Sequence, residues 1–140
     1  MQVLAELDLS LCYSKQPASE VFAAVRLFPR LKVLALRHFG FVGKVDLAVL
    51  QPLSTLEHLV CNYWERVELR GGSCLPQLTF LQLETVNEVD LDAALPSLQV
   101  LEIHKADVVQ LAGASLQLPQ LSCLSLRNIR SATTGVRWSA

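Results

Sequence analysis

The stretch LPQLTFLQLETVNEVDL (residues 75–91) is followed by LPSLQVLEIHKADVVQL (residues 95–111), and the two share one pattern. Each begins with Leu-Pro, continues through an L-x-x-L-x-[L/I] core, and ends in V-x-L. A chain that repeats a pattern at a short, fixed interval builds the same supersecondary unit again beside the last one. The period of this pattern therefore decides the fold.

The core pattern recurs along almost the whole chain. Its first leucines are Leu4, Leu31, Leu56, Leu78, Leu98 and Leu121, which lie 20 to 27 residues apart. A period of about 20–29 residues with this motif is typical of leucine-rich repeats. The chain thus resembles the leucine-rich-repeat family. The resemblance implies an α/β fold: a curved solenoid with parallel strands on its concave face and irregular or short helical returns on its convex side.

The alternation of residues within each motif also predicts stacked parallel strands, on physical grounds alone. L-x-L has the period of a strand that buries one face. One short strand cannot bury its leucines alone, but the next copy, stacked about 4.8 Å away, closes the core and pairs the backbone. We therefore expect parallel strands centred near Leu7, Leu34, Leu59, Leu81, Leu101 and Leu124.

The segments that connect the strands differ along the chain. The first is long, and its sequence predicts a helix over residues 19–28, capped by Ser19 and ended by Pro29. The line LDLSLC before it resembles the Cys-containing repeats of F-box-type receptors. Later connections are too short for a full helix, and we expect extended segments at the four V-x-L pairs: Val45/Leu47, Val67/Leu69, Val89/Leu91 and Val109/Leu111.

One family feature is missing. Many leucine-rich repeats place Asn or Cys three residues after the last core leucine, where the side chain bonds the neighbouring loop. Here that position holds Cys12, Phe39, Trp64, Val86, Ala106 and Ile129, of which only Cys12 fits. Apolar packing must then hold the turns.

The repeats divide the chain into a solenoid of about six repeats over residues 1–130 and a tail or cap over residues 131–140. Leu4 begins a repeat almost at once, which leaves no room for the polar cap that a solenoid end needs. We expect the chain to be part of a longer protein, or a subunit whose open N-terminal end is seated against another protein.

Composition excludes several classes of function. The chain is 51% hydrophobic and 18% charged, but it has no uncharged apolar run of about 18 residues, so no membrane insertion is expected. Its net charge is -1 without a basic block, which argues against nucleic acid. The four cysteines form no C-x-x-C, which favours free thiols in a reducing compartment, hence a cytoplasmic or nuclear protein.

No catalytic, metal or cofactor site is predicted. In the expected register His58 and His104 lie two strands apart, about 10 Å, too far to share a metal held at about 2 Å. Cys123 and His104 sit in different rows with no orienting acid. The acidic run around Glu88, Asp90 and Asp92 lacks calcium-loop spacing, so we interpret it as a solvated convex face.

The concave surface remains as the candidate site, and its side chains fall into three rows. The first row is Glu6, Val33, His58, Phe80, Val100 and Cys123; the second is Asp8, Ala35, Val60, Gln82, Glu102 and Ser125; the third is Ser10, Arg37, Asn62, Glu84, His104 and Arg127. The first row is apolar over most of its length, and contiguous exposed apolar surface usually marks a partner. The alternative is that the tail, or another part of a longer chain, covers this apolar row in place of a partner.

These observations favour a non-enzymatic protein–protein interaction module or scaffold subunit, which binds a protein partner through the concave face or an open solenoid end. The alternative is the substrate-recognition part of an F-box-like ubiquitin-ligase receptor. The residues expected to contact a partner are Val33, Arg37, His58, Val60, Phe80, Glu84, Val100 and Arg127. Phe80, the aromatic side chain at the centre of the rows, is the expected anchor.

Overall fold

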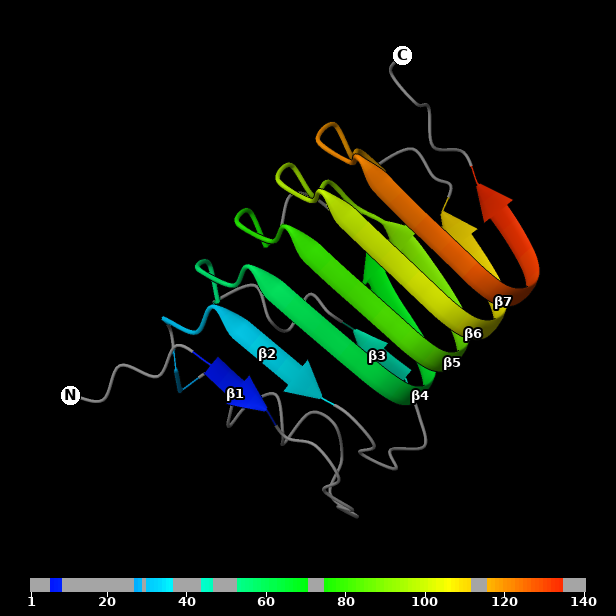
Figure 1. Ribbon diagram of the computed structural model, residues 1–140, viewed down its shortest axis with the longest axis horizontal. Helices are drawn as coiled ribbons and strands as arrows, with labels where there is room; N and C mark the ends of the chain where they lie inside the picture. Colours follow the sequence, from blue (N-terminus) through cyan, green and yellow to red (C-terminus); the bar gives the residue numbers. More distant parts are fainter. Residues whose placement is uncertain are drawn as a thin grey trace.

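The computed structural model describes residues 6–8, 27–28, 30–36, 44–46, 53–70, 75–111 and 116–134. Figure 1 shows this part of the chain as a stack of parallel strands. The strands are β1 (Glu6–Asp8), β2 (Val33–Leu36), β3 (Lys44–Asp46), β4 (His58–Arg70), β5 (Phe80–Asp92), β6 (Val100–Leu111) and β7 (Cys123–Thr134).

The strands join in the order β1-β2-β4-β5-β6-β7, and β3 pairs beside β4. Every pairing is parallel, and the central leucine of each motif lies next to that of the following motif: Leu7, Leu34, Leu59, Leu81, Leu101 and Leu124. The predicted strands, their direction and their register are therefore confirmed. The architecture is a solenoid in which each repeat contributes one coil.

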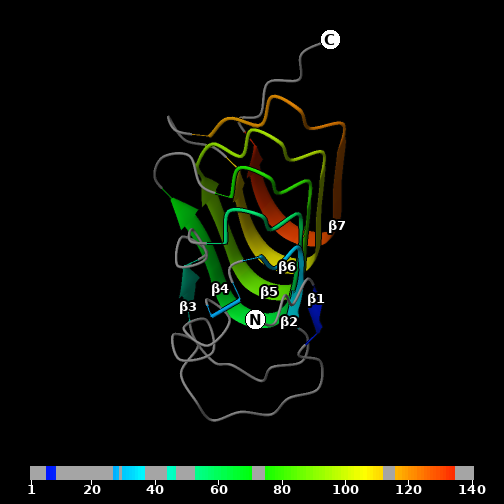
Figure 2. The same ribbon diagram turned by 90° about the vertical axis from the view of Figure 1, so that its left-hand side faces the viewer.

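Each long strand, from β4 to β7, bends into two arms (Figure 2). In β5 the first arm is residues 80–84 and the second arm is residues 86–92. The two arms face one another across the core, and both pair with the matching arms of the adjacent coils, as Glu84↔His104 and Val86↔Ala106 do. Two residues of β5, Thr85 at the bend and Asn87 just after it, make no ladder pair with either neighbour. One strand therefore forms two walls of the coil.

The residue at the bend has a left-handed backbone conformation. Its φ is 56° at Thr85, 59° at Lys105 and 57° at Asn128. A single left-handed residue turns the chain sharply without ending the strand, in the manner of a bulge. Asn tolerates this conformation, whereas for a β-branched residue it is an outlier that stores strain. The bend is thus set by backbone geometry, and its sequence varies from coil to coil.

Three of the four V-x-L segments are extended, as predicted; of the first pair, Val45 lies in β3 and Leu47 lies outside the described residues. Val67, Leu69, Val89, Leu91, Val109 and Leu111 lie in the second arms and are buried. The short helical returns expected from the family resemblance are not found: the described residues contain no helix, and where returns are described they are strands. The helix expected over residues 19–28 lies outside the described residues, apart from its last two positions.

A tight turn leads into each first arm. The amide of Leu78 donates to the carbonyl of Leu75 over 3.1 Å, and Leu98 donates to Leu95 over 3.3 Å. Proline occupies the second position of both turns, where its fixed φ fits and no amide proton is needed. The repeated Leu-Pro is therefore a turn signal, as the sequence indicates.

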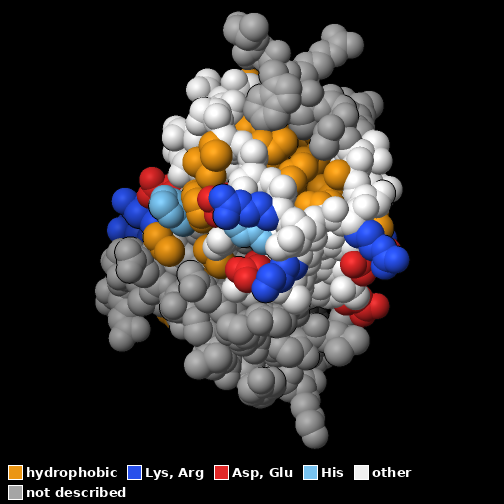
Figure 3. Space-filling view, turned by 45° about the vertical axis from the view of Figure 1, so that its right-hand side comes forward, with side chains coloured by type: hydrophobic (Ala, Val, Ile, Leu, Met, Phe, Trp, Pro, Cys, Tyr) orange, Lys and Arg blue, Asp and Glu red, His pale blue; other side chains and the backbone are white. Residues whose placement is uncertain are grey.

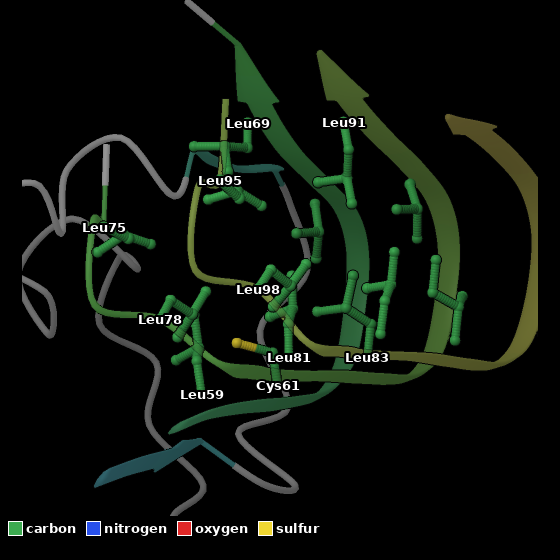
Figure 4. Close-up of a cluster of buried hydrophobic side chains, with 14 of the residues drawn as sticks. Leu59, Cys61, Leu69, Leu75, Leu78, Leu81, Leu83, Leu91, Leu95 and Leu98 are labelled. Carbon is green, nitrogen blue, oxygen red and sulfur yellow. The ribbon is translucent and has the colours of Figure 1, made fainter. Parts of the chain in front are cut away.

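Leucines from both arms and from the turns fill the interior (Figure 4). Leu59, Leu81 and Leu101 have no exposed surface at all. Val86 and Ala106, which stand where the family usually has Asn, are also buried, so apolar packing does line the turns. Residues 131–134, assigned to the tail from the sequence, form the end of β7. No helix in the described ranges is long and apolar enough to cross a membrane.

The first prediction compares one substitution at two levels of the stack. Leu81→Ala should cost about 2–5 kcal/mol in unfolding free energy, because a fully buried leucine leaves a cavity between two coils. Leu124→Ala, in the same row but half exposed, should cost clearly less. Urea denaturation followed by circular dichroism measures both. Equal losses would contradict the observed stacking.

The second prediction concerns the bend. Thr85→Asn should raise the unfolding free energy by about 1 kcal/mol, because Asn adopts the left-handed conformation more readily than a β-branched residue. Asn128→Thr, the reverse change at the same position of β7, should lower it. The same denaturation measurement applies, and two changes of the same sign would show that φ at the bend does not govern stability.

Candidate partner-binding surface

The outward face of the first arms, called the front face below, carries the three predicted rows. The observed register places Val33, His58, Phe80, Val100 and Cys123 side by side in the first row. The second row aligns Ala35, Val60, Gln82, Glu102 and Ser125, and the third aligns Asn62, Glu84, His104 and Arg127. Among the predicted contact residues, Arg37 lies outside the described residues.

The first row is open to solvent along the stack. His58 and Cys123 are exposed, while Val33, Phe80 and Val100 are half-buried. Val60 is different, because only 8% of its surface is accessible. Val60 can pack beside the first-row side chains, but it offers a partner little accessible area. The accessible apolar surface therefore runs along the first row.

An aromatic pair occupies the middle of that row. The rings of His58 and Phe80 stack with centroids 5.5 Å apart and an interplanar angle of 29°. Aromatic rings at this separation attract one another and restrict each other's rotamers. Phe80 is thus held in place on the surface before any partner arrives.

Polar side chains in the second and third rows bond from coil to coil. Gln82 Nε2 donates to Glu102 Oε2 over 3.2 Å, and His104 Nε2 lies 3.4 Å from Ser125 Oγ. Glu84 is half-buried and Arg127 is exposed beside them. One edge of the apolar row is therefore lined by groups that can donate or accept hydrogen bonds.

Among the described third-row residues, Asn62 alone is nearly inaccessible. Its exposed fraction is 8%, and its Oδ1 makes no hydrogen bond. Its row neighbour on β5 is Glu84, a carboxylate that cannot donate when ionised. Among the described neighbours, β5 thus offers Asn62 Oδ1 no donor, and Asn62 itself gives a partner little area.

The candidate catalytic and metal pairs do not come together. Cys123 pairs with Val100, which lies four residues before His104 along the first arm. His58 and His104 lie in different rows and two strands apart. In the described part of the chain no group of three or more His, Cys, Asp or Glu side chains is placed to hold a metal ion.

The outward face of the second arms carries an ion network that sequence reasoning missed. Arg66 binds Glu68, Glu88 and Asp90, with nitrogen–oxygen distances of 3.3 Å to Glu68 and 3.5 Å to Asp90. Asp90 is only 5% exposed, so the interpretation of this run as solvated is wrong for that residue. Extending the register into the V-x-L segments would have placed Arg66 beside Glu88.

Comparisons with known proteins give no relative. No family model matches the chain, and no curated protein or solved structure matches it either. The site is therefore interpreted from its own geometry.

The two described thiols should differ sharply in reactivity. Burial raises the pKa of Cys61 to about 12, so its thiolate is scarce at any pH below that value, whereas Cys123 is exposed. Iodoacetamide at pH 8 should label Cys123 within minutes and Cys61 only after denaturation. Peptide mass mapping distinguishes the sites, and labelling of Cys61 in the folded protein would contradict its burial.

Proposed function

We propose that this chain is a non-enzymatic interaction module that binds a protein partner through the front face. The observation that supports this most directly is the apolar first row, in which His58, Phe80 and Val100 remain accessible on strands β4 to β6, whose inner leucines are fully buried. A soluble sheet normally presents polar side chains to water. An apolar row bordered by polar groups is the pattern of a contact surface.

Within this surface Phe80 is the proposed anchor. It lies on β5, with three first-row positions on one side and two on the other, and it is already stacked on His58. Binding energy concentrates in central, well-packed aromatic residues that surrounding contacts shield from water. A preordered ring also loses less entropy when it is bound.

The polar border is proposed to set orientation. Glu84 and Arg127 lie in the third row, two strands apart, with His104 between them. Charges at the rim of an interface affect association rate and partner choice more than affinity. A partner segment with an apolar side chain for the first row, and with opposite charges at matching positions, would fit this arrangement.

The finer family assignment is part of the same proposal. The six motifs and the parallel, in-register ladder support a leucine-rich-repeat solenoid with short, extended returns, in which the front face would be the concave one. In such a solenoid the concave surface is formed by parallel strands and extends across several repeats. The front face is likewise formed by parallel strands, β2 and β4 to β7, from successive repeats.

The test is a single substitution with a matched control. Phe80→Ala should weaken binding to a partner, identified by affinity capture and then purified, by roughly thirtyfold, because an aromatic anchor is lost. Asn87→Ala, at an exposed site on the second arm of the same strand, should leave affinity unchanged. Isothermal titration calorimetry gives both affinities. A folded Phe80→Ala variant that binds as tightly as the parent would refute the anchor.

A further inference from the structure

Four polar side chains form a square on the front face, called the polar quartet below. They are Gln82 and Glu84 on β5 and Glu102 and His104 on β6. All four are half-buried, and the strands on either side, β4 and β7, are also described. Figure 3 shows histidine and acidic side chains among hydrophobic ones on one side of the molecule. The quartet therefore lies within the stack of coils and keeps accessible surface for a partner.

The quartet has more hydrogen-bond acceptors than donors. Gln82 Nε2 donates to Oε2 of Glu102 over 3.2 Å, while His104 Nε2 lies 3.4 Å from Ser125 Oγ, outside the quartet. Glu84 makes no hydrogen bond or ion pair with another side chain of the described residues. An ionised carboxylate can only accept hydrogen bonds. Glu84 and the second oxygen of Glu102 therefore lack a donor from the described residues.

A further acceptor borders the quartet on β4. Asn62 is the row neighbour of Glu84, its side chain is more than nine-tenths buried, and its Oδ1 has no hydrogen-bond partner. A buried amide oxygen without a donor is uncommon in a folded protein. A group with several N–H donors that binds Glu84 from outside could also serve Asn62 after rotation of the amide. The unpartnered amide is thus a second observation, independent of the carboxylates, that favours a donor from a partner.

The two carboxylates of the quartet also lack a cation. Glu84 and Glu102 are diagonal in the register, with Cα atoms about 8 Å apart, so their charges repel one another. Arg127 lies diagonal to Glu102 on β7, but no ion pair joins the two. On the second arms, by contrast, Arg66 holds three carboxylates. The fold supplies an internal cation to those acids, whereas the acids of the quartet are left for an external one.

A basic side chain meets these requirements best. The described residues place no three His, Cys, Asp or Glu side chains so as to hold a metal ion. A lysine or an arginine carries its positive charge together with several N–H donors, and its hydrogen bonds to carboxylates are among the strong ones. The centre of the quartet lies about 10 Å along β5 from Phe80. An extended partner segment therefore reaches both with an apolar and a basic residue about two to four positions apart.

We propose that the polar quartet is the subsite for a lysine or arginine of the protein partner, while a nearby apolar side chain of the same segment packs on Phe80. This inference rests on the proposed function, because it names the chemistry of the segment that binds the front face. It also predicts selectivity: an acidic residue at the same place would put like charges against Glu84 and Glu102 and be rejected.

Selection from a phage-displayed library of short random peptides tests the proposal. Peptides enriched on the parent protein should carry Lys or Arg about two to four positions from an apolar residue. For a synthesised copy of such a peptide, Glu84→Gln and Glu102→Gln should each weaken binding by about 3–10-fold, measured by fluorescence anisotropy. Glu65→Gln, the same change at an exposed site on the second arm of β4, should leave binding unchanged.

A double-mutant cycle then assigns the contact. Once the basic residue of the peptide is replaced by Gln, Glu84→Gln and Glu102→Gln should cost little further affinity, because the charge they meet is gone. Circular dichroism checks that each variant is folded. Gln has the shape of Glu and both sites are partly accessible, so the fold should be retained.

The outcomes separate this inference from the proposed function. Enriched peptides that need Phe80 but show no preference for Lys or Arg would overturn the subsite and leave the interaction surface standing. Basic peptides that bind the parent and both glutamine variants equally well would overturn it too, since their charge is then read elsewhere. No enrichment, or equal enrichment on Phe80→Ala and the parent, would count against the subsite and the interaction surface together.

Discussion

Each core leucine in this protein is buried only because the adjacent coils carry a leucine at the same height. Leu81 lies between Leu59 and Leu101 and has no exposed surface, whereas Leu124, with a neighbour on one side among the described strands, is half exposed. Burial of a leucine contributes roughly 1.5–3 kcal/mol, and here that contribution needs an adjacent coil. Register between coils is therefore the constraint on which the rest of the structure depends.

The outer surface follows from the same constraint. Because inner leucines are locked in register, outward residues align into rows whether or not they attract one another. Some rows then gain contacts of their own, such as the ring stack of His58 on Phe80 and the three carboxylates around Arg66. The apolar first row and the exposed β7 end are both consequences of stacking, one along the coils and one where the described coils stop.

The bend of the long strands shows where local sequence carries little information. Thr85, Lys105 and Asn128 occupy the same left-handed position, although only Asn has a clear preference for it. The buried residues on both sides, Leu83 and Val86 in β5, fix the two arms and force the intervening residue to turn. Tertiary packing thus overrides the propensity of the single residue. In the same region the short helical returns that the family resemblance implied are not found among the described residues, and the second arms are strands, as the V-x-L spacing predicted.

The sequence by itself determined the repeat, the parallel register and the order of side chains within each row of the front face, because a strict spacing of leucines admits only one alignment of the described strands. Accessibility was decided by the tertiary structure. Val60 and Asp90 look exposed in the pattern, yet both are buried, since exposure depends on neighbouring coils that lie more than twenty residues away in the chain. The two-armed strand was also settled only in three dimensions, because the V-x-L segments become a second wall only when several coils pair them side by side.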